Sequence, residues 1–170
     1  MIVKTDILNL TIKWLSVSLL FLPFMMCGQN NLESYFSVPE KSIFTAGQRM
    51  AGRTINWQFT VKAEKKLTIK SMVVYNNELL FEPLLLQKGR EYKIKIVKRI
   101  WEEKTDQGFE SKESWTIMIM SDGHTIEVVP QVKEQQPFPE NIQLVVKAGC
   151  KKYTKVNLQK EKLIEEINAP

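Results

Sequence analysis

The 170-residue chain has few of the residues on which most metal and thiol sites depend. Its two cysteines and one histidine are too few for a disulfide framework or for the clustered nitrogen and sulfur ligands of a structural zinc site. We find no internal repeat, no low-complexity tract and no arginine-rich block. The sequence therefore predicts no metal and no cofactor, and it contains no recognisable catalytic signature.

The chain also lacks a strong charge of either sign. Its formal net charge is +5, and the basic residues are spread along the sequence. Such a balance favours solubility and weak attraction to anionic surfaces over specific recognition of nucleic acid. We expect no nucleic-acid partner.

The first 28 residues have the layout of an export signal. Lys4 and Lys13 precede an uncharged apolar stretch over residues 14–26, which is short for a membrane-spanning helix of about 20 apolar residues. We therefore predict a signal helix that takes no part in the folded domain. The protein is expected to be exported to the cell envelope, and an uncleaved anchor is the weaker interpretation.

Cys27 stands at the end of the apolar stretch, where secreted lipoproteins carry the cysteine that receives a diacylglycerol and becomes the first mature residue. The flanking residues favour neither lipidation nor ordinary secretion. Residues 24–26 are bulky for a lipoprotein peptidase. Ordinary cleavage after Gly28 has a small residue at the cut but the large Met26 at the other recognition position. A lipid anchor at Cys27 and a secreted form both stay open.

Beyond residue 35, short strand patterns alternate with turn signals. Residues 53–62 place Ile55, Trp57, Phe59 and Val61 on one face and polar residues on the other, as in a strand with one face on a core and one in water. Tight turns are expected at residues 76–77 and 121–123. Further strands are predicted at residues 37–43, 67–75, 78–81, 91–101, 114–120, 124–129, 142–147 and 152–156.

Seven to nine short strands without alternating long helices favour a mainly β fold, an antiparallel β-sandwich, over a βαβ fold. Over residues 36–157 the pattern resembles an immunoglobulin-like sandwich, as in many small bacterial envelope proteins, but without the cysteine pair and intervening tryptophan of antibody domains. The resemblance implies architecture and no activity. Residues 29–35 are expected to form a polar tether. Residues 158–170 are expected to form a short helical tail, because Leu163, Ile164 and Ile167 have helical spacing.

Two features are candidate contacts for a ligand or partner. Lys93, Lys95 and Arg99 lie on the polar side of the strand at residues 91–101, with Lys98 next to them. They could bind phosphate or an anionic lipid, but the favoured interpretation is a solvent-facing or edge strand whose positive charges discourage edge-to-edge association. Trp57 and Trp115 fall in phase with core residues, whereas Trp101 does not. We therefore take Trp101 as the tryptophan most suited to contact a sugar or peptide.

Three other groups are weaker candidates. His124 follows an Asp-Gly turn, and Cys150 is expected to be a buried thiol; a catalytic pair of the two is the less favoured interpretation. An acidic group on the expected connection between residues 101 and 114 suits general acid–base chemistry or Ca²⁺, but interspersed Lys104 and Lys112 favour a solvated loop. Its members are Glu102, Glu103, Asp106, Glu110 and Glu113.

Together these patterns favour a non-enzymatic envelope protein, a membrane-anchored or secreted β-sandwich that binds another envelope protein or a glycan. One alternative is a hydrolase or transferase, which requires two carboxylates converging in a cleft. Another is a carrier of a small ligand or lipid, which requires a cavity between the sheets. The bulky residues expected to face inward would fill such a cavity.

Overall fold

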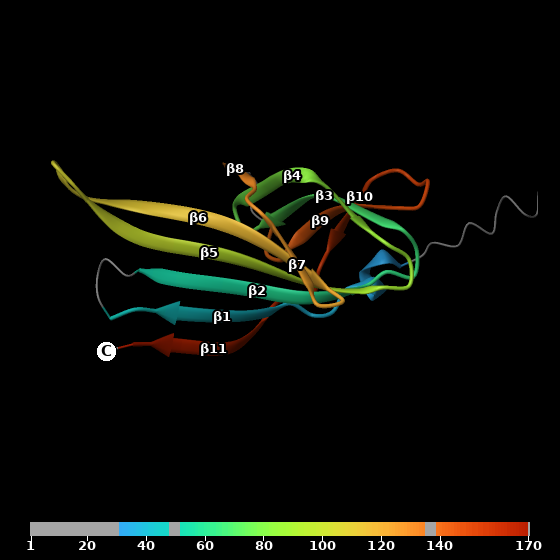
Figure 1. Ribbon diagram of the computed structural model, residues 1–170, viewed down its shortest axis with the longest axis horizontal. Coiled ribbons are helices and arrows are strands. Elements are labelled where there is room, and N and C mark those ends of the chain that lie inside the picture. The colour runs from blue at the N-terminus through green and yellow to red at the C-terminus, as the bar shows by residue number, and fades with distance from the viewer. Residues whose placement is uncertain (1–30, 48–51, 135–138, 170) are drawn as a thin grey trace, which may run out of the picture. The chain divides into compact units, whose positions relative to one another are not determined.

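The computed structural model describes residues 31–47, 52–134 and 139–169 (Figure 1). The expected signal helix, Cys27 and the first two residues of the expected tether lie outside these ranges. The described residues form two β-sheets, of six and five strands. Sheet A has the order β11 (Lys162–Asn168), β1 (Glu40–Thr45), β2 (Arg53–Lys62), β5 (Glu91–Thr105), β6 (Gly108–Ser121), β7 (His124–Val128). Sheet B has the order β10 (Thr154–Asn157), β9 (Gln143–Ala148), β3 (Leu67–Val74), β4 (Asn77–Leu86), β8 (Gln131–Glu134).

The predicted mainly β fold is confirmed, with more strands in the described ranges than the seven to nine expected. Every strand pair is antiparallel except β1 with β11. The chain leaves sheet A after β2, forms the β3–β4 hairpin of sheet B, and returns to place β5 beside β2. The chain therefore crosses between the two sheets, which pack on one common core.

The core forms where the apolar faces of the two sheets meet. Trp57 of β2 pairs with Ile96 of β5, which pairs with Ile117 of β6, so the three side chains lie side by side on one face of sheet A. All three are buried, and they belong to one cluster with Leu67 of β3 and Leu144 of β9. Burial of each such side chain stabilises the fold by about 1.5–3 kcal/mol. The period-2 alternation in the sequence predicted these faces because successive strand residues point to opposite sides.

The C-terminal segment is a strand, and the predicted helical tail is wrong. β11 runs parallel to β1, with one register shift that leaves Ile164 between the paired residues Leu163 and Glu165. A helix of ten residues is marginal by itself, whereas the free edge of β1 satisfies the backbone of this segment with a hydrogen-bonded ladder. At the other end, residues Leu32–Tyr35 form a 3₁₀-helix, and Tyr35 is buried. The helix occupies the last four residues of the expected polar tether.

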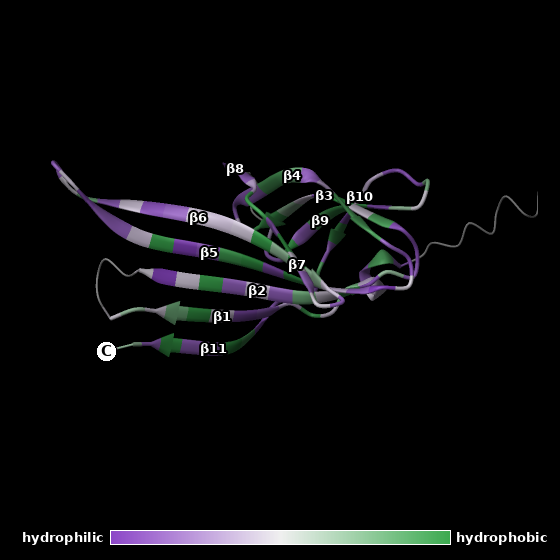
Figure 2. Cartoon of the chain, viewed as in Figure 1, coloured by the Kyte–Doolittle hydropathy of each residue, from purple (hydrophilic) through white to green (hydrophobic). Residues whose placement is uncertain are grey.

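The β5–β6 hairpin is longer than the sequence suggested. The expected connection over residues 102–113 continues the two strands to a turn at Asp106 and Gln107, with an unbroken register from Lys93↔Met120 to Thr105↔Gly108. Its far part, from Trp101 through the turn to Glu113, has no buried residue. In Figure 1 this part extends past the other strands, and in Figure 2 hydrophilic residues predominate along it. Cross-strand hydrogen bonds hold it together where a core is lacking.

Two tight turns connect the strands of the β6–β7 and β3–β4 hairpins. Asp122 and Gly123 have positive φ angles of 51° and 77° between β6 and β7, as expected from the sequence. In the β3–β4 hairpin the turn lies one residue earlier than predicted: Val74 pairs with Asn77, and Tyr75 has a φ of 53°. The turn carries a tyrosine in a conformation that glycine or asparagine usually takes, and the Tyr75 side chain makes contacts described below.

Candidate functional site

Four of the residues singled out in the sequence lie on one face of β5. The pairing of β5 with β2 and β6 has no register shift, so Lys93, Lys95, Arg99 and Trp101 all point away from the face that carries Ile94 and Ile96. Lys93 and Arg99 are exposed, and Lys95 and Trp101 are half-buried. The basic side chains and the ambiguous tryptophan therefore form one column on the outer face of sheet A.

Arg99 also lies in a row of paired residues that crosses five strands, from Ile167 of β11 to Ser114 of β6. Phe44 pairs with Thr54, Thr54 with Arg99, and Arg99 with Ser114. Neighbouring strands are about 4.8 Å apart, so the part of the row from Phe44 to Ser114 spans roughly 14 Å across the sheet. Phe44 is 45% exposed. The outer face thus presents a guanidinium between two hydroxyl groups, with the exposed ring of Phe44 next to Thr54 in the same row.

A shallow hollow of about 300 Å³, here called the outer hollow, lies at the crossing of this row and the β5 column. Its lining has two arginines, two hydroxyl residues and an indole, and no acidic side chain. Within the described ranges, neither Arg53 nor Arg99 has a hydrogen bond or ion pair through its side chain. The lining residues are Arg53, Thr54, Arg99, Ile100, Trp101 and Ser114.

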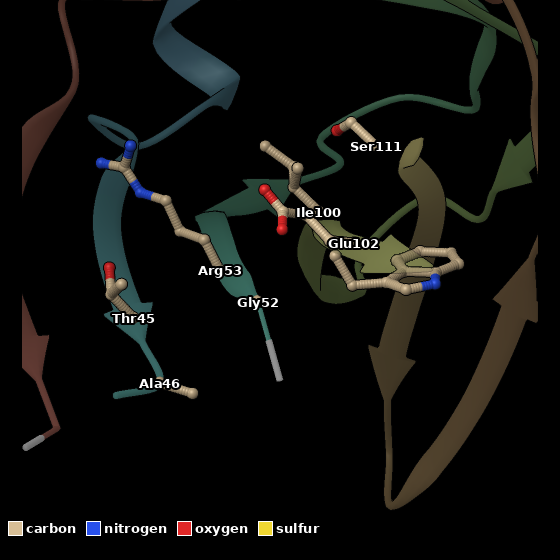
Figure 3. Close-up of a pocket in the computed structure, with 8 residues that line it drawn as sticks. Thr45, Ala46, Gly52, Arg53, Ile100, Glu102 and Ser111 are labelled. Atoms are coloured by element: carbon tan, nitrogen blue, oxygen red, sulfur yellow. The ribbon is translucent and has the colours of Figure 1, made fainter. Parts of the chain in front are cut away.

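A second hollow of about 270 Å³, the end hollow, shares Arg53, Ile100 and Trp101 with the first. Figure 3 shows the residues that line it, from the end of β1, the start of β2 and the facing parts of β5 and β6. Gly52 lets the start of β2 lie against β5, because a Cβ atom there would stand 2.0 Å from the carbonyl oxygen of Ile100. Its φ of +77° is also one that side chains disfavour. Glu102 is the single carboxylate in the lining.

Lys98, adjacent in sequence to the basic residues, lies on the opposite face of β5. Its Nζ lies 2.7 Å from a carboxylate oxygen of Glu113 and 4.8 Å from the ring centroid of Trp115. The Trp115 indole donates a hydrogen bond of 3.1 Å to Glu113. Burial acts to raise the pKa of Glu113, but the hydrogen bonds from Lys98 and Trp115 outweigh it and lower the pKa. These contacts close the core where the free part of the hairpin begins.

A second charged group joins the two sheets beside the core and had no signal in the sequence. Lys41 of β1 donates a hydrogen bond of 2.7 Å to the Tyr75 hydroxyl, which itself donates to Glu161. Lys41 also forms an ion pair of 3.3 Å with Glu161 and lies over the rings of Tyr75 and Trp57. Trp57 stacks on Trp115 at 5.9 Å.

This Lys41–Tyr75–Glu161 cluster holds its tyrosine in the protonated form. Burial and the hydrogen bond to Glu161 raise the Tyr75 pKa, against the opposing effect of Lys41. Burial acts to lower the Lys41 pKa, but its contacts with Tyr75 and Glu161 raise it overall. A phenol with a raised pKa is a poor general base at neutral pH. The cluster therefore suits a structural link between the sheets better than proton transfer.

The weaker candidates are not brought together. His124 is at the exposed edge of its turn. Cys150 is exposed in the connection between β9 and β10, so the expected burial of this thiol is wrong. The reason is that the β9 ladder ends at Ala148, and Gly149 turns the chain with a φ of 58°. Neither side chain has a polar contact within the described ranges.

The acidic residues of the hairpin are distributed along two strands. Glu110 is paired with Lys112 at 2.7 Å and Glu113 with Lys98, and Glu103 lies directly opposite Glu110. Across the described residues, no group of three or more histidine, cysteine or acidic side chains is placed to hold a metal ion. Two of the hairpin acids, Glu110 and Glu113, therefore have lysine counterions, and the described acids have no common centre.

No protein-family model matches the chain, and neither the curated proteins nor the solved structures include a match. In the part of the chain that the structure describes, no helix is long and apolar enough to cross a membrane.

Proposed function

We propose that the protein is a non-enzymatic binding module of the cell envelope, and that it binds its partner on the outer face of sheet A around the outer hollow. The observation that carries this proposal is the composition of that hollow. It gathers two arginines without an internal counterion and two hydroxyl residues from β2, β5 and β6, together with the half-buried indole of Trp101, where the free half of the β5–β6 hairpin begins.

These groups are of the kind that binding surfaces use. Arginine and tryptophan contribute disproportionately to binding energy, because each combines a large contact area with directed hydrogen bonds. A site of about 300 Å³ is at the lower end of the range for small-molecule pockets. Its shallow form suits contact with part of a larger molecule better than enclosure of a substrate.

Neither hollow meets the condition set for a hydrolase or transferase. The outer hollow has no carboxylate in its lining, and the end hollow has Glu102 alone. General acid–base hydrolysis with paired carboxylates needs a second acid facing the first. The carrier alternative is disfavoured by Trp57, Phe59 and Ile94, which pack with sheet B between the sheets.

The fold supports a more specific proposal, that the sandwich is immunoglobulin-like. The sheet order β10-β9-β3-β4 and the pairing of β2 with β5 correspond to the central pairings of such domains. After β5, however, the chain moves outward through β6 and β7, where an immunoglobulin domain has a strand D that precedes its strand E. The proposal therefore concerns the central strands.

We further propose that the module reaches the envelope through the signal at residues 1–28, either as a lipoprotein anchored at Cys27 or in secreted form. Mass spectrometry of the mature N-terminus after expression with the native signal separates the two. A diacylated peptide that begins at Cys27 establishes the anchor, and an unmodified peptide that begins at Gln29 establishes secretion. An intact N-terminus on the exported chain contradicts both.

The binding proposal is tested with Trp101→Ala and Arg99→Ala variants and immobilised envelope material from the source cells. Matched controls are Phe109→Ala, an exposed aromatic at the hairpin tip, and Arg90→Ala, whose guanidinium pairs with Asp122 away from the hollow. We expect each hollow variant to lose at least about tenfold in retention, about 1.4 kcal/mol, at an unchanged melting temperature. Equal retention of all four variants would contradict the proposal.

A further inference from the structure

We infer that the outer hollow binds an acidic saccharide, a sugar ring that carries a carboxylate, in a chain of such sugars lying along β5. This inference rests on the proposed binding function and names its ligand class. It is carried by three properties of the same surface: unpaired cations, aromatic rings that flank them, and a dense set of hydroxyl and amide groups.

The first property is charge complementarity. Arg99 lines the outer hollow without an acidic neighbour in the lining, and Lys95 and Lys93 continue its column along β5. Arg53 lines the hollow from the start of β2, where it pairs with Ile100 and not with Arg99. At a rise of about 3.4 Å per residue, Lys95 lies roughly 14 Å along the strand from Arg99. A guanidinium binds a carboxylate through two parallel hydrogen bonds. The column therefore suits a ligand that has carboxylates at intervals and extends beyond the hollow.

The second property is the position of two aromatic side chains around Arg99. Trp101 is two residues further along β5, about 7 Å away, and Phe44 is two strands away, about 10 Å. Phe44 is exposed, and Trp101 is half-buried. Sugar rings have an apolar face of C–H groups that packs against such rings, while their hydroxyl groups stay available for hydrogen bonds. The guanidinium thus lies between two surfaces suited to adjacent sugar rings.

The third property is the polar composition of the rest of the face. Thr54 and Ser114 flank Arg99 in the same row, and Gln58 and Thr60 continue along β2. Hydroxyl and amide groups both donate and accept hydrogen bonds, which matches the mixed donors and acceptors of a sugar. A nonspecific anion site would not need them.

Peptides and nucleic acids fit this surface less well. A peptide that adds a strand needs a free sheet edge, whereas Arg99 at the centre of the hollow is paired with Thr54 of β2 on one side and Ser114 of β6 on the other. Single-stranded nucleic acid needs a positively charged groove and stacking platforms for successive bases. Here the cations lie in one column. The row of paired residues that contains Lys95 also contains two acidic residues, Glu40 on β1 and Glu127 on β7.

The test uses the exported protein and a hexamer of galacturonic acid, with binding measured by calorimetry. The matched uncharged probe is the methyl ester of the same hexamer. Polyglutamate and an oligothymidylate represent acidic peptides and nucleic acid. We expect the hexamer to bind and its ester to bind at least about tenfold more weakly. We also expect Arg99→Ala and Trp101→Ala each to weaken binding by at least about tenfold, with Arg90→Ala and Phe109→Ala unchanged.

Fluorescence locates the contact. Trp57 and Trp115 are 2% and 3% exposed, so the hexamer should change the emission of Trp101, and a Trp101→Phe variant should lose that change. Equal binding of the ester, of polyglutamate or of the oligothymidylate would overturn the inference, as would absence of hexamer binding. If the hollow variants still lose retention on envelope material, the binding function stands and only the ligand class fails. If they retain it, both fail.

Discussion

The two halves of the β5–β6 hairpin have the same backbone pairing and opposite environments. Around Ile96 and Ile117 the inner face is buried against sheet B, whereas from Trp101 to the turn both faces reach solvent. The register is continuous through both halves. Strand pairing is therefore sufficient to extend the hairpin, but packing on one face decides where side chains stabilise the fold and where they stay available for binding.

The largest difference in stability should be between alanine variants of two tryptophans, Trp57 in the packed half of sheet A and Trp101 in the free half of the hairpin. Trp57→Ala removes a buried indole that stacks on Trp115 and should lower the free energy of unfolding by about 3–5 kcal/mol. Trp101→Ala should cost less than about 1 kcal/mol, because its side chain is half-buried on a surface. Urea denaturation followed by far-UV circular dichroism measures both. Similar losses would refute the division into a packed half and a free half.

Gly52→Ala tests whether a residue near the free half can also be important for stability. We expect this substitution to be destabilising. The new Cβ would meet the carbonyl oxygen of Ile100 at 2.0 Å, and the φ of +77° disfavours any side chain. We expect a loss of about 1–3 kcal/mol. Gly89→Ala is the matched control: its φ is +81° but no atom lies within 4 Å of its Cβ position. Equal losses in the two variants would show that the conformation matters and the contact with β5 does not.

Tyr75→Phe tests the cluster that joins the sheets beside the packed half. It removes hydrogen bonds to Lys41 and Glu161 and should cost about 1–2 kcal/mol at neutral pH. The folded-state pKa values of Lys41 and Tyr75 are both raised. Their stabilisation is therefore complete below the unfolded-state values of about 10 and is lost as pH rises through the folded-state values.

The loss of stability at alkaline pH can be measured by thermal denaturation. The melting temperature of the wild type should fall more steeply than that of Tyr75→Phe between about pH 9 and about pH 11. Parallel curves would mean that the cluster contributes no pH-dependent stability. Tyr153→Phe, an exposed tyrosine in the connection before β10, controls for the titration of a phenol outside the cluster.

The smallest effect is expected for Glu113→Gln, at the boundary between the two halves. The hydrogen bonds from Lys98 and Trp115 lower the pKa of Glu113 against the effect of burial. Its contribution is therefore present above the unfolded-state pKa of about 4.3 and is lost as pH falls through the lower folded-state value. Thermal melts between about pH 6 and about pH 3 should show a slightly flatter curve for the variant. A steeper curve would reverse the assigned sign.

Strand faces were predictable where one side meets a core. β2 was predicted at residues 53–62, and its inward residues Trp57, Phe59 and Val61 are buried as expected. Of the candidate contacts, Arg99 and Trp101 do line one hollow, and Lys93 and Lys95 share its face. Their grouping with Thr54 and Ser114 could not be predicted, because it depends on the register with β2 and β6, and the sequence of one strand contains no register.

The missed elements share a physical cause. The hairpin beyond Trp101 has few apolar residues to mark its alternation, and β11 has a helical spacing of Leu163, Ile164 and Ile167. Both segments are strands because a neighbouring edge offers backbone hydrogen bonds. Local propensity is weak compared with such pairing. The Lys41–Tyr75–Glu161 cluster was missed for a related reason: its members are far apart in sequence and meet only when the sheets pack.

The sequence by itself determined the fold class and the inward faces of the central strands, because burial of apolar side chains follows the two-residue period of a strand. The tertiary structure decided which strand edges pair, how far the hairpin extends and which polar side chains converge. Those outcomes depend on register and on contacts between distant segments. The outer hollow belongs to this second group, since Arg99 and Trp101 acquire their neighbours only through the pairing of β5 with β2 and β6.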